Sequence, residues 1–200
     1  MNPASQRFER VVQQILEQDR AVIDGFFPDQ ILVPLRDRIA QLQAEDALRP
    51  AAVGAAGQKE VHTEIRSDFI RWWSDTPEFP AERAFLQEVE ALASYLNQTC
   101  FTGIQRWEFM YAVYPPGAHY ERHVDDFKNK NARKFSVVTY LNEAWQPGQG
   151  GELVLYDVAG QPRETVEPLF GRTVIFSSPQ VEHEVLPAVA DRWSVTGWLR

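Results

Sequence analysis

The sequence predicts an α+β fold in which a helical first half supports a β-sandwich or β-barrel. Apolar residues recur at helical spacing in the first hundred residues, as in "RFERVVQQILEQ". From residue 104 onward, short β-branched and aromatic runs alternate with turn sequences such as "QPGQGG" and "LFGR". Helices followed by many short strands are typical of α+β proteins and not of alternating α/β sheets.

Three helices are expected in the first half. The first covers residues 7–18 and the third covers residues 80–99. The second follows Pro28 and contains Pro34, so it is expected either to begin at that proline or to kink there. The Ala- and Gly-rich segment 49–61 interrupts the helical half and is expected to be a mobile loop.

Strands are expected upstream of the third helix and throughout the second half. The upstream candidate is "EIRSDFIRWW", with Trp72 and Trp73 at its end. The later candidates are "RWEFMYAVYPPG", "FSVVTYLN", "ELVLYDV", "TVIFSS" and "RWSVTGWLR". The 200 residues are expected to form one domain, with residues 1–100 as mainly helical support and residues 101–200 as the β core.

Composition narrows the class of protein. The net charge of -8 disfavours nucleic acid as a partner, and the basic run "KNKNARK" is most simply a solvated loop. No apolar run is long enough for a membrane span, and the N-terminus lacks the apolar core of a secretory signal. The single cysteine, Cys100, cannot form an internal disulfide and is expected to be buried packing. A cytoplasmic protein without membrane contact is therefore expected.

The chemistry is expected at "YERHVDDF". His123 and Asp125 lie two residues apart, a spacing that places both side chains on one face of a strand. His183 follows sixty residues later and supplies a third ligand, whereas His62 and His119 are not expected to bind metal. Two histidines and one carboxylate form the facial triad of non-haem Fe(II) oxygenases, which leaves coordination positions for a co-substrate and dioxygen.

A further residue indicates which co-substrate is bound. Arg192 follows His183 by nine residues, so the chain reaches the next strand there. Its planar guanidinium suits a bidentate carboxylate. A molecule that chelates iron at one end and presents a carboxylate at the other is 2-oxoglutarate. Ser194 shares the face of Arg192 and is a weaker candidate donor.

Together, His123-x-Asp125, His183 and Arg192 resemble the Fe(II)/2-oxoglutarate dioxygenases. The stretches "YPPGAHYERHVDD", "VVTYLNEAW", "GGELVLY" and "VEHEVLPAVADRWSVTGW" are similar to prolyl 4-hydroxylases of the oxygen-sensing, HIF-hydroxylase type, which has bacterial members. Arg192 stands where collagen-type relatives have Lys. The resemblance implies a double-stranded β-helix, of the jelly-roll or cupin-like kind, with the N-terminal helices packed on its larger sheet.

The resemblance also implies roles in cofactor binding. His123, Asp125 and His183 would bind Fe(II), and Arg192 would pair with the distal carboxylate of 2-oxoglutarate. The Tyr140 hydroxyl would assist Arg192. Three further residues would line that pocket: Tyr114, Thr196 and Met110. Dioxygen is the second co-substrate, and ascorbate is the expected reductant.

Other positions are implied to face the substrate. Arg133 and Trp198 would contact the peptide, and Trp72 would close over the site with the loop before it. Arg66 and Asp68 fall in an "IRxD" element that steadies this loop. Substrate choice is assigned to 49–61, a segment that matches no specific family loop.

The activity implied is hydroxylation of proline C4 in a protein, coupled to decarboxylation of 2-oxoglutarate to succinate and CO2. A translation elongation factor is a possible substrate, because bacterial relatives act on one. The alternatives are an oxygenase acting on another residue type or a small molecule, and a non-catalytic metal-binding sensor barrel. A nucleic-acid demethylase is disfavoured, because those relatives have Arg-x5-Arg after the last histidine and because the chain is acidic.

Overall fold

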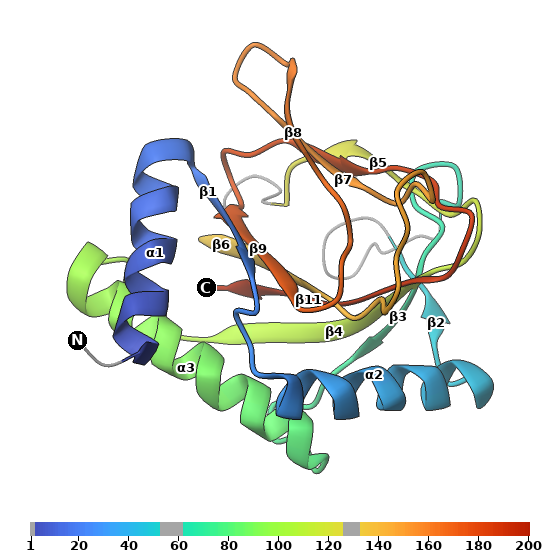
Figure 1. Cartoon of the computed structure of the whole chain (residues 1–200), viewed down its shortest axis with the longest axis horizontal. Helices are drawn as coiled ribbons and strands as arrows, with labels where there is room; N and C mark the ends of the chain where they lie inside the picture. The colour runs from blue at the N-terminus through green and yellow to red at the C-terminus, as the bar shows by residue number, and fades with distance from the viewer. Residues whose placement is uncertain (1–2, 53–61, 126–132) are drawn as a thin grey trace.

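The structure is a computed structural model that describes residues 3–52, 62–125 and 133–200 (Figure 1). It confirms an α+β fold with a double-stranded β-helix core and helices on the larger sheet. No helix among the described residues is long and apolar enough to cross a bilayer.

Three helices form where the apolar periodicity predicts them. They are α1 (Pro3–Gln18), α2 (Asp29–Ala44) and α3 (Pro80–Cys100). Pro80 opens α3, a position where the missing N–H costs nothing. Helix α2 begins at Asp29 and runs through Pro34, so the prediction of a start at that proline is wrong.

Eleven strands form two antiparallel sheets in the described chain. The larger sheet has the order β1-β9-β6-β11-β4-β3-β2, and the smaller has the order β5-β10-β7-β8. The strands are β1 (Arg20–Asp24), β2 (Arg49–Pro50), β3 (Phe69–Trp72), β4 (Trp107–Tyr114), β5 (Tyr120–His123), β6 (Phe135–Tyr140), β7 (Leu153–Tyr156), β8 (Pro162–Val166), β9 (Arg172–Ser177), β10 (His183–Val185) and β11 (Arg192–Leu199).

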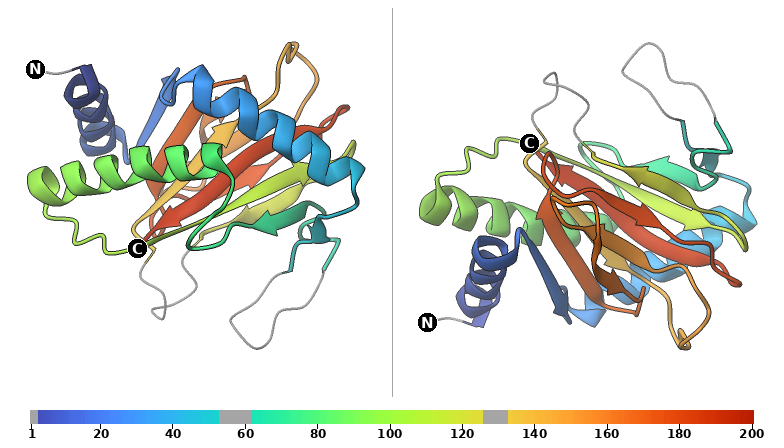
Figure 2. Two further views of the ribbon diagram at one scale, coloured as in Figure 1. Left: turned by 90° about the horizontal axis from the view of Figure 1, so that it is seen from below. Right: turned by 90° about the horizontal axis from the view of Figure 1, so that it is seen from above.

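The helices cover the outer face of the larger sheet, as both views of Figure 2 show. Helix α1 contacts β1 and α3, and α2 contacts α3. Between the helices and the sheet lies an aromatic core in which Phe85 stacks on Phe27 with ring centroids 4.1 Å apart and meets Phe109 edge-on. A second core, which includes Tyr140 and Phe176, lies between the two sheets. The helical layer therefore backs the sheet whose inner face lines the space between the two sheets.

Several expectations differ from the structure. The upstream strand is only Phe69–Trp72, and Trp73 instead packs edge-on against Phe85 in the helix-facing core. Cys100 is only partly buried, because it is the last residue of α3. Of the predicted loop 49–61, residues 53–61 lie outside the described residues, while Arg49–Pro50 form β2.

Candidate metal centre and co-substrate pocket

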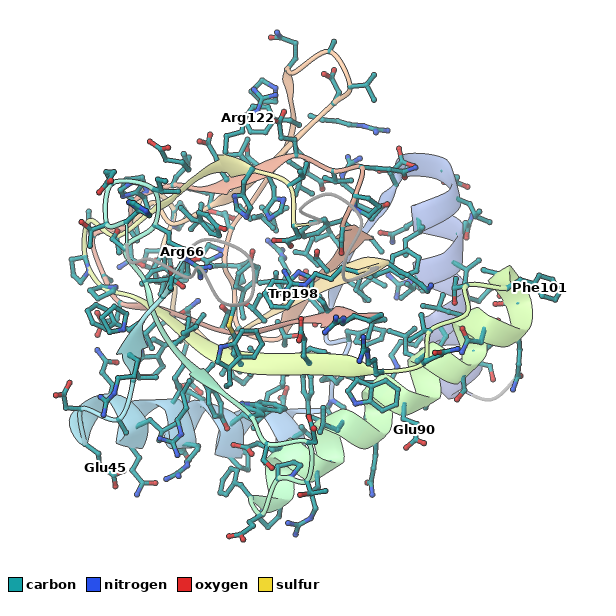
Figure 3. The ribbon with its side chains drawn as sticks, turned by 180° about the vertical axis from the view of Figure 1, so that it is seen from behind. Glu45, Arg66, Glu90, Phe101, Arg122 and Trp198 are labelled. Carbon is teal, nitrogen blue, oxygen red and sulfur yellow. The ribbon has the colours of Figure 1, made fainter. Side chains whose placement is uncertain are left out.

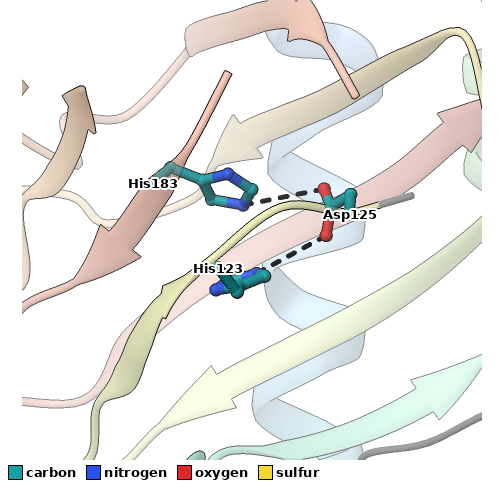
Figure 4. Close-up of side chains that lie close together, drawn as sticks. All are labelled: His123, Asp125 and His183. Atoms are coloured by element: carbon teal, nitrogen blue, oxygen red, sulfur yellow. Dashed lines mark ion pairs between the residues drawn. The ribbon is translucent and has the colours of Figure 1, made fainter. Parts of the chain in front are cut away.

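His123, Asp125 and His183 meet between the two sheets (Figure 4). One ligand atom from each lies within 4.8 Å of the others. His123 Nε2 is 3.5 Å from one Asp125 oxygen, and His183 Nε2 is 3.6 Å from the other. These separations suit three atoms directed at one common ion.

The backbone brings the three residues together in a way the sequence anticipates only in part. His123 and His183 face each other across the β5–β10 pair. The prediction that Asp125 shares a strand face with His123 is wrong, because strand β5 ends at His123 and Asp125 lies just beyond it. The bend after the strand still directs its carboxylate toward both imidazoles.

Hydrogen bonds select the imidazole atom that is available to a metal. His123 Nδ1 lies 2.6 Å from the Glu121 carbonyl oxygen, and His183 Nδ1 lies 3.1 Å from the Val181 carbonyl oxygen. A carbonyl only accepts, so each Nδ1 carries the proton and each Nε2 presents its lone pair. This pattern is usual for histidine ligands held by backbone carbonyls.

Asp125 is poised as an anion. Ser136 donates a 2.6 Å hydrogen bond to its carboxylate and is itself 2.8 Å from the Ser178 hydroxyl. Burial alone would raise the pKa of Asp125, but the two imidazoles and Ser136 outweigh it and hold that pKa well below its ordinary value. Burial also lowers the pKa of His183 to about 4. Ionised carboxylate and neutral imidazole are the states that ligate a metal.

Arg192 places a buried cation beside this triad. It is 2% exposed and lines the same pocket as His123, Asp125 and His183. Its Nε donates a 2.7 Å hydrogen bond to the Gly151 carbonyl, and its guanidinium carbon lies 4.9 Å from the ring centroids of both Tyr114 and Tyr140. No carboxylate in the described chain forms an ion pair with it. A buried guanidinium without a counter-charge is costly, so the pocket suits an anionic ligand.

Two polar atoms nearby also lack a partner. The Tyr140 hydroxyl and the Trp198 indole N–H are buried, and neither donates a hydrogen bond to an acceptor in the described chain. Burial raises the pKa of the Tyr140 hydroxyl, so it remains a donor. A buried donor next to a buried cation matches a carboxylate ligand.

The remaining predicted pocket residues come from the same two strands. Met110 and Tyr114 are on β4, Thr196 is on β11 beside Arg192, and all three line the pocket. Ser194 is fully buried and lies 3.1 Å from the Thr196 hydroxyl, but it does not line the pocket. The structure thus brings Met110, Tyr114, Arg192 and Thr196 to one pocket, with Tyr140 beside Arg192, but it leaves Ser194 outside.

The predicted substrate contacts lie at the mouth of the pocket, on an adjoining groove of about 440 Å³. Arg133 stacks on Trp198 at 3.6 Å and forms a 2.8 Å ion pair with Glu108. Trp72 is 41% exposed, and its ring lies 5.9 Å from that of Trp198. The groove and the pocket share Met110, Tyr120, Asp125 and Trp198, together with Arg66, so they are continuous.

Sequence reasoning missed Tyr120. Its ring stacks on the His123 ring with centroids 3.6 Å apart. The guanidinium carbon of Arg66 lies 4.3 Å from the centroid of the same tyrosine ring. Arg66 in turn makes two hydrogen bonds, of 2.8 and 2.6 Å, with Asp68. The "IRxD" element therefore reaches a metal ligand through an aromatic ring. Ser136 was missed too, although a lone serine in the apolar run "FSVVTY" is a weak signal.

The other two histidines stay away from the triad. His119 contacts the Glu64 carbonyl and the Ser67 hydroxyl, and His62 lies 3.3 Å from Glu64. His123, Asp125 and His183 are the only group in the described chain that could hold a metal ion.

Fold and site together define an oxygenase with a facial-triad iron centre and an acidic co-substrate. The three donors fit Fe(II), and the unbalanced Arg192 with the unpartnered Tyr140 hydroxyl fits the distal carboxylate of 2-oxoglutarate. Residues 109–200 match the model of the 2OG-Fe(II) oxygenase superfamily.

Comparisons narrow the class further. The chain is 36% identical to a Pseudomonas putida prolyl-4-hydroxylase, with a TM-score of 0.86 over 96% of this chain and 98% of that one. A Trichoplax adhaerens prolyl hydroxylase, solved with a hypoxia inducible factor oxygen degradation domain peptide, is 26% identical with the same TM-score over 98% and 90% of the two chains. The chain belongs to the prolyl 4-hydroxylase family of 2OG-Fe(II) oxygenases.

A curated relative matches over a shorter region. Rat Egl nine homolog 1 is 36% identical over 96 residues, which are 46% of this chain and 28% of that protein. The chain thus aligns with little more than a quarter of that relative.

Proposed function

We propose that the protein is a peptidyl-prolyl 4-hydroxylase. In the overall reaction, proline, 2-oxoglutarate and O2 give 4-hydroxyproline, succinate and CO2, so one oxygen atom enters each organic product. The observation that carries the proposal is the buried, unpaired Arg192 guanidinium in the same pocket as the metal triad. The 36% identity to a prolyl-4-hydroxylase over nearly its whole length supports proline as the target.

Each residue has a distinct task in this proposal. His123, Asp125 and His183 would hold Fe(II), which when bound supplies the oxygen activation and redox chemistry that side chains lack. Arg192 and the Tyr140 hydroxyl would bind the distal carboxylate of 2-oxoglutarate. Tyr114, Thr196 and Met110 would line that pocket and exclude water.

The groove residues would position the peptide. Trp198 and Trp72 offer aromatic surface next to the metal triad, and Arg133 is fixed between Trp198 and the Asp125 carbonyl, to which it donates at 3.2 Å. This arrangement would hold a proline ring at the mouth of the pocket, where proximity to the metal decides which carbon reacts.

Three finer points are also proposals. A translation elongation factor is the protein substrate we would test first, ascorbate is the reductant we would supply, and the cytoplasm is the compartment we expect. An oxygenase acting on another residue or a small molecule, and a silent metal-binding barrel, are outcomes of the test below.

The test measures succinate and a +16 Da change on proline after incubating the protein with Fe(II), 2-oxoglutarate, ascorbate and a bacterial protein extract. Succinate with hydroxyproline supports the proposal, and succinate without hydroxyproline replaces proline with another target. Absence of succinate under all conditions would leave the silent barrel.

Two variants test the co-substrate site. Tyr140→Phe removes one hydrogen bond and should raise the 2-oxoglutarate requirement by about tenfold, whereas Arg192→Ala should raise it far more. Asp37→Ala, at an exposed position of α2, is the control. An unchanged requirement in Arg192→Ala would place the carboxylate elsewhere.

A further inference from the structure

The groove beside the metal centre has a charge opposite to that of the chain. The chain carries 28 acidic and 20 basic residues. Yet four of the described residues that line the groove are arginines, at positions 49, 66, 71 and 133, against one carboxylate, that of Asp125. That carboxylate belongs to the metal triad, so no other described lining residue offers an acidic group to a substrate.

Local pairing balances two of these four arginines. Arg66 forms two hydrogen bonds with Asp68, so this ion pair contributes no net charge. Arg133 forms a 2.8 Å ion pair with Glu108. The charge that is available to a substrate therefore comes from the remaining two arginines.

Arg49 and Arg71 are less balanced still. Both are exposed, and neither forms an ion pair with a carboxylate of the described residues. Arg49 donates to the carbonyls of Asp46 and Leu48, and Arg71 donates to the carbonyl of Ala47. Carbonyls orient a guanidinium without neutralising it, so Arg49 retains its full charge for an incoming partner. Arg71 is opposite Tyr111 on the helix-facing side of the sheet and interacts electrostatically with the Glu82 carboxylate, so its charge is partly balanced.

The position of Arg49 puts its charge beside the apolar part of the groove. Arg49 is paired with Ile70 across β2 and β3, so both side chains lie on one face of the sheet. Pro50, Ile70, Trp72 and Trp198 line the same groove. Figure 3 labels two of the lining residues, Arg66 and Trp198, in the space between the two sheets. An apolar floor next to the metal and a cation at the outer edge match a peptide with a proline and a nearby carboxylate.

We propose that Arg49, with Arg71 as a weaker second contact, selects substrates in which acidic residues flank the target proline. This inference rests on the proposed prolyl hydroxylation and specifies the chemical class of its peptide. Each guanidinium would form a charge-assisted hydrogen bond with a Glu or Asp side chain of the peptide, and the potential of the groove would steer acidic chains to it. A peptide is favoured over nucleic acid because the apolar floor between Pro50 and Trp72 suits a proline ring, and because the chain as a whole is acidic.

The test uses three fluorescent peptides of equal length with one central proline and two variable flanking positions, filled with Glu, Gln or Lys. Binding to the full chain with Fe(II) and 2-oxoglutarate is followed by anisotropy without oxygen, and hydroxylation is followed by mass after oxygen is admitted. The Glu peptide should bind about tenfold more tightly than the Gln peptide at low salt, with the Lys peptide weakest. The difference should shrink in high salt because salt screens exposed charges.

Charge reversal localises the effect. Arg49→Glu should reduce the preference for the Glu peptide and improve binding of the Lys peptide, and Arg71→Glu should have a smaller effect in the same direction. Arg10→Glu, at an exposed position of α1, makes the same change in net charge and should leave the preference unchanged. Thermal unfolding of each variant confirms that the chain is folded.

The outcomes separate this inference from the proposed reaction. Equal binding and equal hydroxylation of the three peptides would overturn the acidic preference and keep the hydroxylase. Preferred binding of the Glu peptide, with no hydroxylation of any peptide, would keep the preference and overturn the proline chemistry. Displacement of the Glu peptide by a single-stranded oligo-dT at lower concentration than by unlabelled Glu peptide would replace the peptide with nucleic acid.

Discussion

The two sheets of this protein divide the site between a thick, regular wall and a thin, irregular one. Strands β4 and β11 pair in unbroken register over eight residues, from Arg192 opposite Tyr114 to Leu199 opposite Trp107, and the helices cover their outer face. Strands β5 and β10 have four and three residues, and their register shifts between His183 and Val185. The regular wall holds the co-substrate residues and the irregular wall holds both histidine ligands.

The difference between the two sheets indicates which part of the site depends on a bound ligand for its stability. The larger sheet obtains stability from the aromatic core beneath the helices. The short strands bring two imidazoles and a carboxylate together with few backbone bonds. Metal binding would supply the missing stability there, because a ligand that binds only the folded state stabilises it.

Removing the triad carboxylate should have the largest effect. Asp125→Ala should abolish iron-dependent succinate release, because two histidines do not complete the facial triad. The metal-free protein should unfold within about 1 kcal/mol of the wild type, since Ser136 keeps its bond to Ser178. The wild type should gain about 2.7 kcal/mol at an iron concentration 100-fold above its Kd, and the variant should not.

Asp37→Ala, at an exposed position of α2, is the control for that comparison. Iron titration with denaturant unfolding measures the gain, and full activity in Asp125→Ala would remove this residue from the site.

A single added methyl group should destabilise the regular wall where β11 packs against β4. A Cβ at Gly197 of β11 would lie 2.3 Å from the Glu108 carbonyl oxygen and 2.4 Å from the Phe109 ring of β4. Gly197→Ala should therefore cost about 3 kcal/mol of unfolding free energy with or without metal. Val158→Ala, at a fully exposed turn position, should change it by less than about 0.5 kcal/mol. Urea unfolding measures both, and a Gly197→Ala protein as stable as the wild type would refute the tight β11–β4 contact.

Tyr120 connects the "IRxD" element to the irregular wall, and its substitution should have a smaller effect. Tyr120→Leu removes the ring that lies between Arg66 and His123 and should weaken iron affinity about tenfold, as loss of a group supporting a ligand usually does. Tyr120→Phe keeps the ring and should bind iron normally. Anaerobic iron titration distinguishes them, and equal loss in both variants would indicate that the hydroxyl matters instead.

The smallest expected effect is a pH dependence of the unfolding free energy that comes from Glu82, a helix residue packed on the regular wall. Burial raises the pKa of Glu82 on α3, against the opposing effect of a 2.9 Å hydrogen bond from the Tyr111 hydroxyl. A raised pKa means that the folded state binds the proton more tightly. Glu82 therefore contributes stability that is present below its ordinary value of 4.5 and is lost as the pH rises through its folded pKa.

Glu82→Gln should remove this dependence and leave the protein up to about 1 kcal/mol more stable than the wild type at pH 7. Urea unfolding between pH 4 and pH 7 measures it. Parallel stability curves for the two proteins would contradict the shifted pKa.

The sequence predicts the regular wall better than the thin one, for a physical reason. The helices and the long strands have many apolar residues in clear periodicity, so α1, α3, β4 and β11 are evident from pattern alone. Strands β1, β2, β8 and β10 were not predicted. Strand β8 is the charged run "PRETV", and β1, β2 and β10 have only five, two and three residues, too few to show a clear periodicity.

The site shows the same contrast. Residue type and spacing suffice to predict His123, Asp125, His183 and Arg192 as partners, because few chemistries need that set. Tyr120 and Ser136 escape prediction, since their roles come from contacts made across the chain, with Arg66 and Ser178 respectively. Such contacts are a property of the folded chain and have no local pattern.

The placement of β2 and β3 has a consequence for how such enzymes diversify. These two short strands close one end of the larger sheet, and they carry Arg49, Pro50, Ile70 and Trp72 of the groove but none of the metal ligands. Under the proposed function, inherited changes at this margin alter which peptide is bound while the metal ligands stay the same. A lineage with that function would therefore acquire new targets without passing through an inactive ancestor.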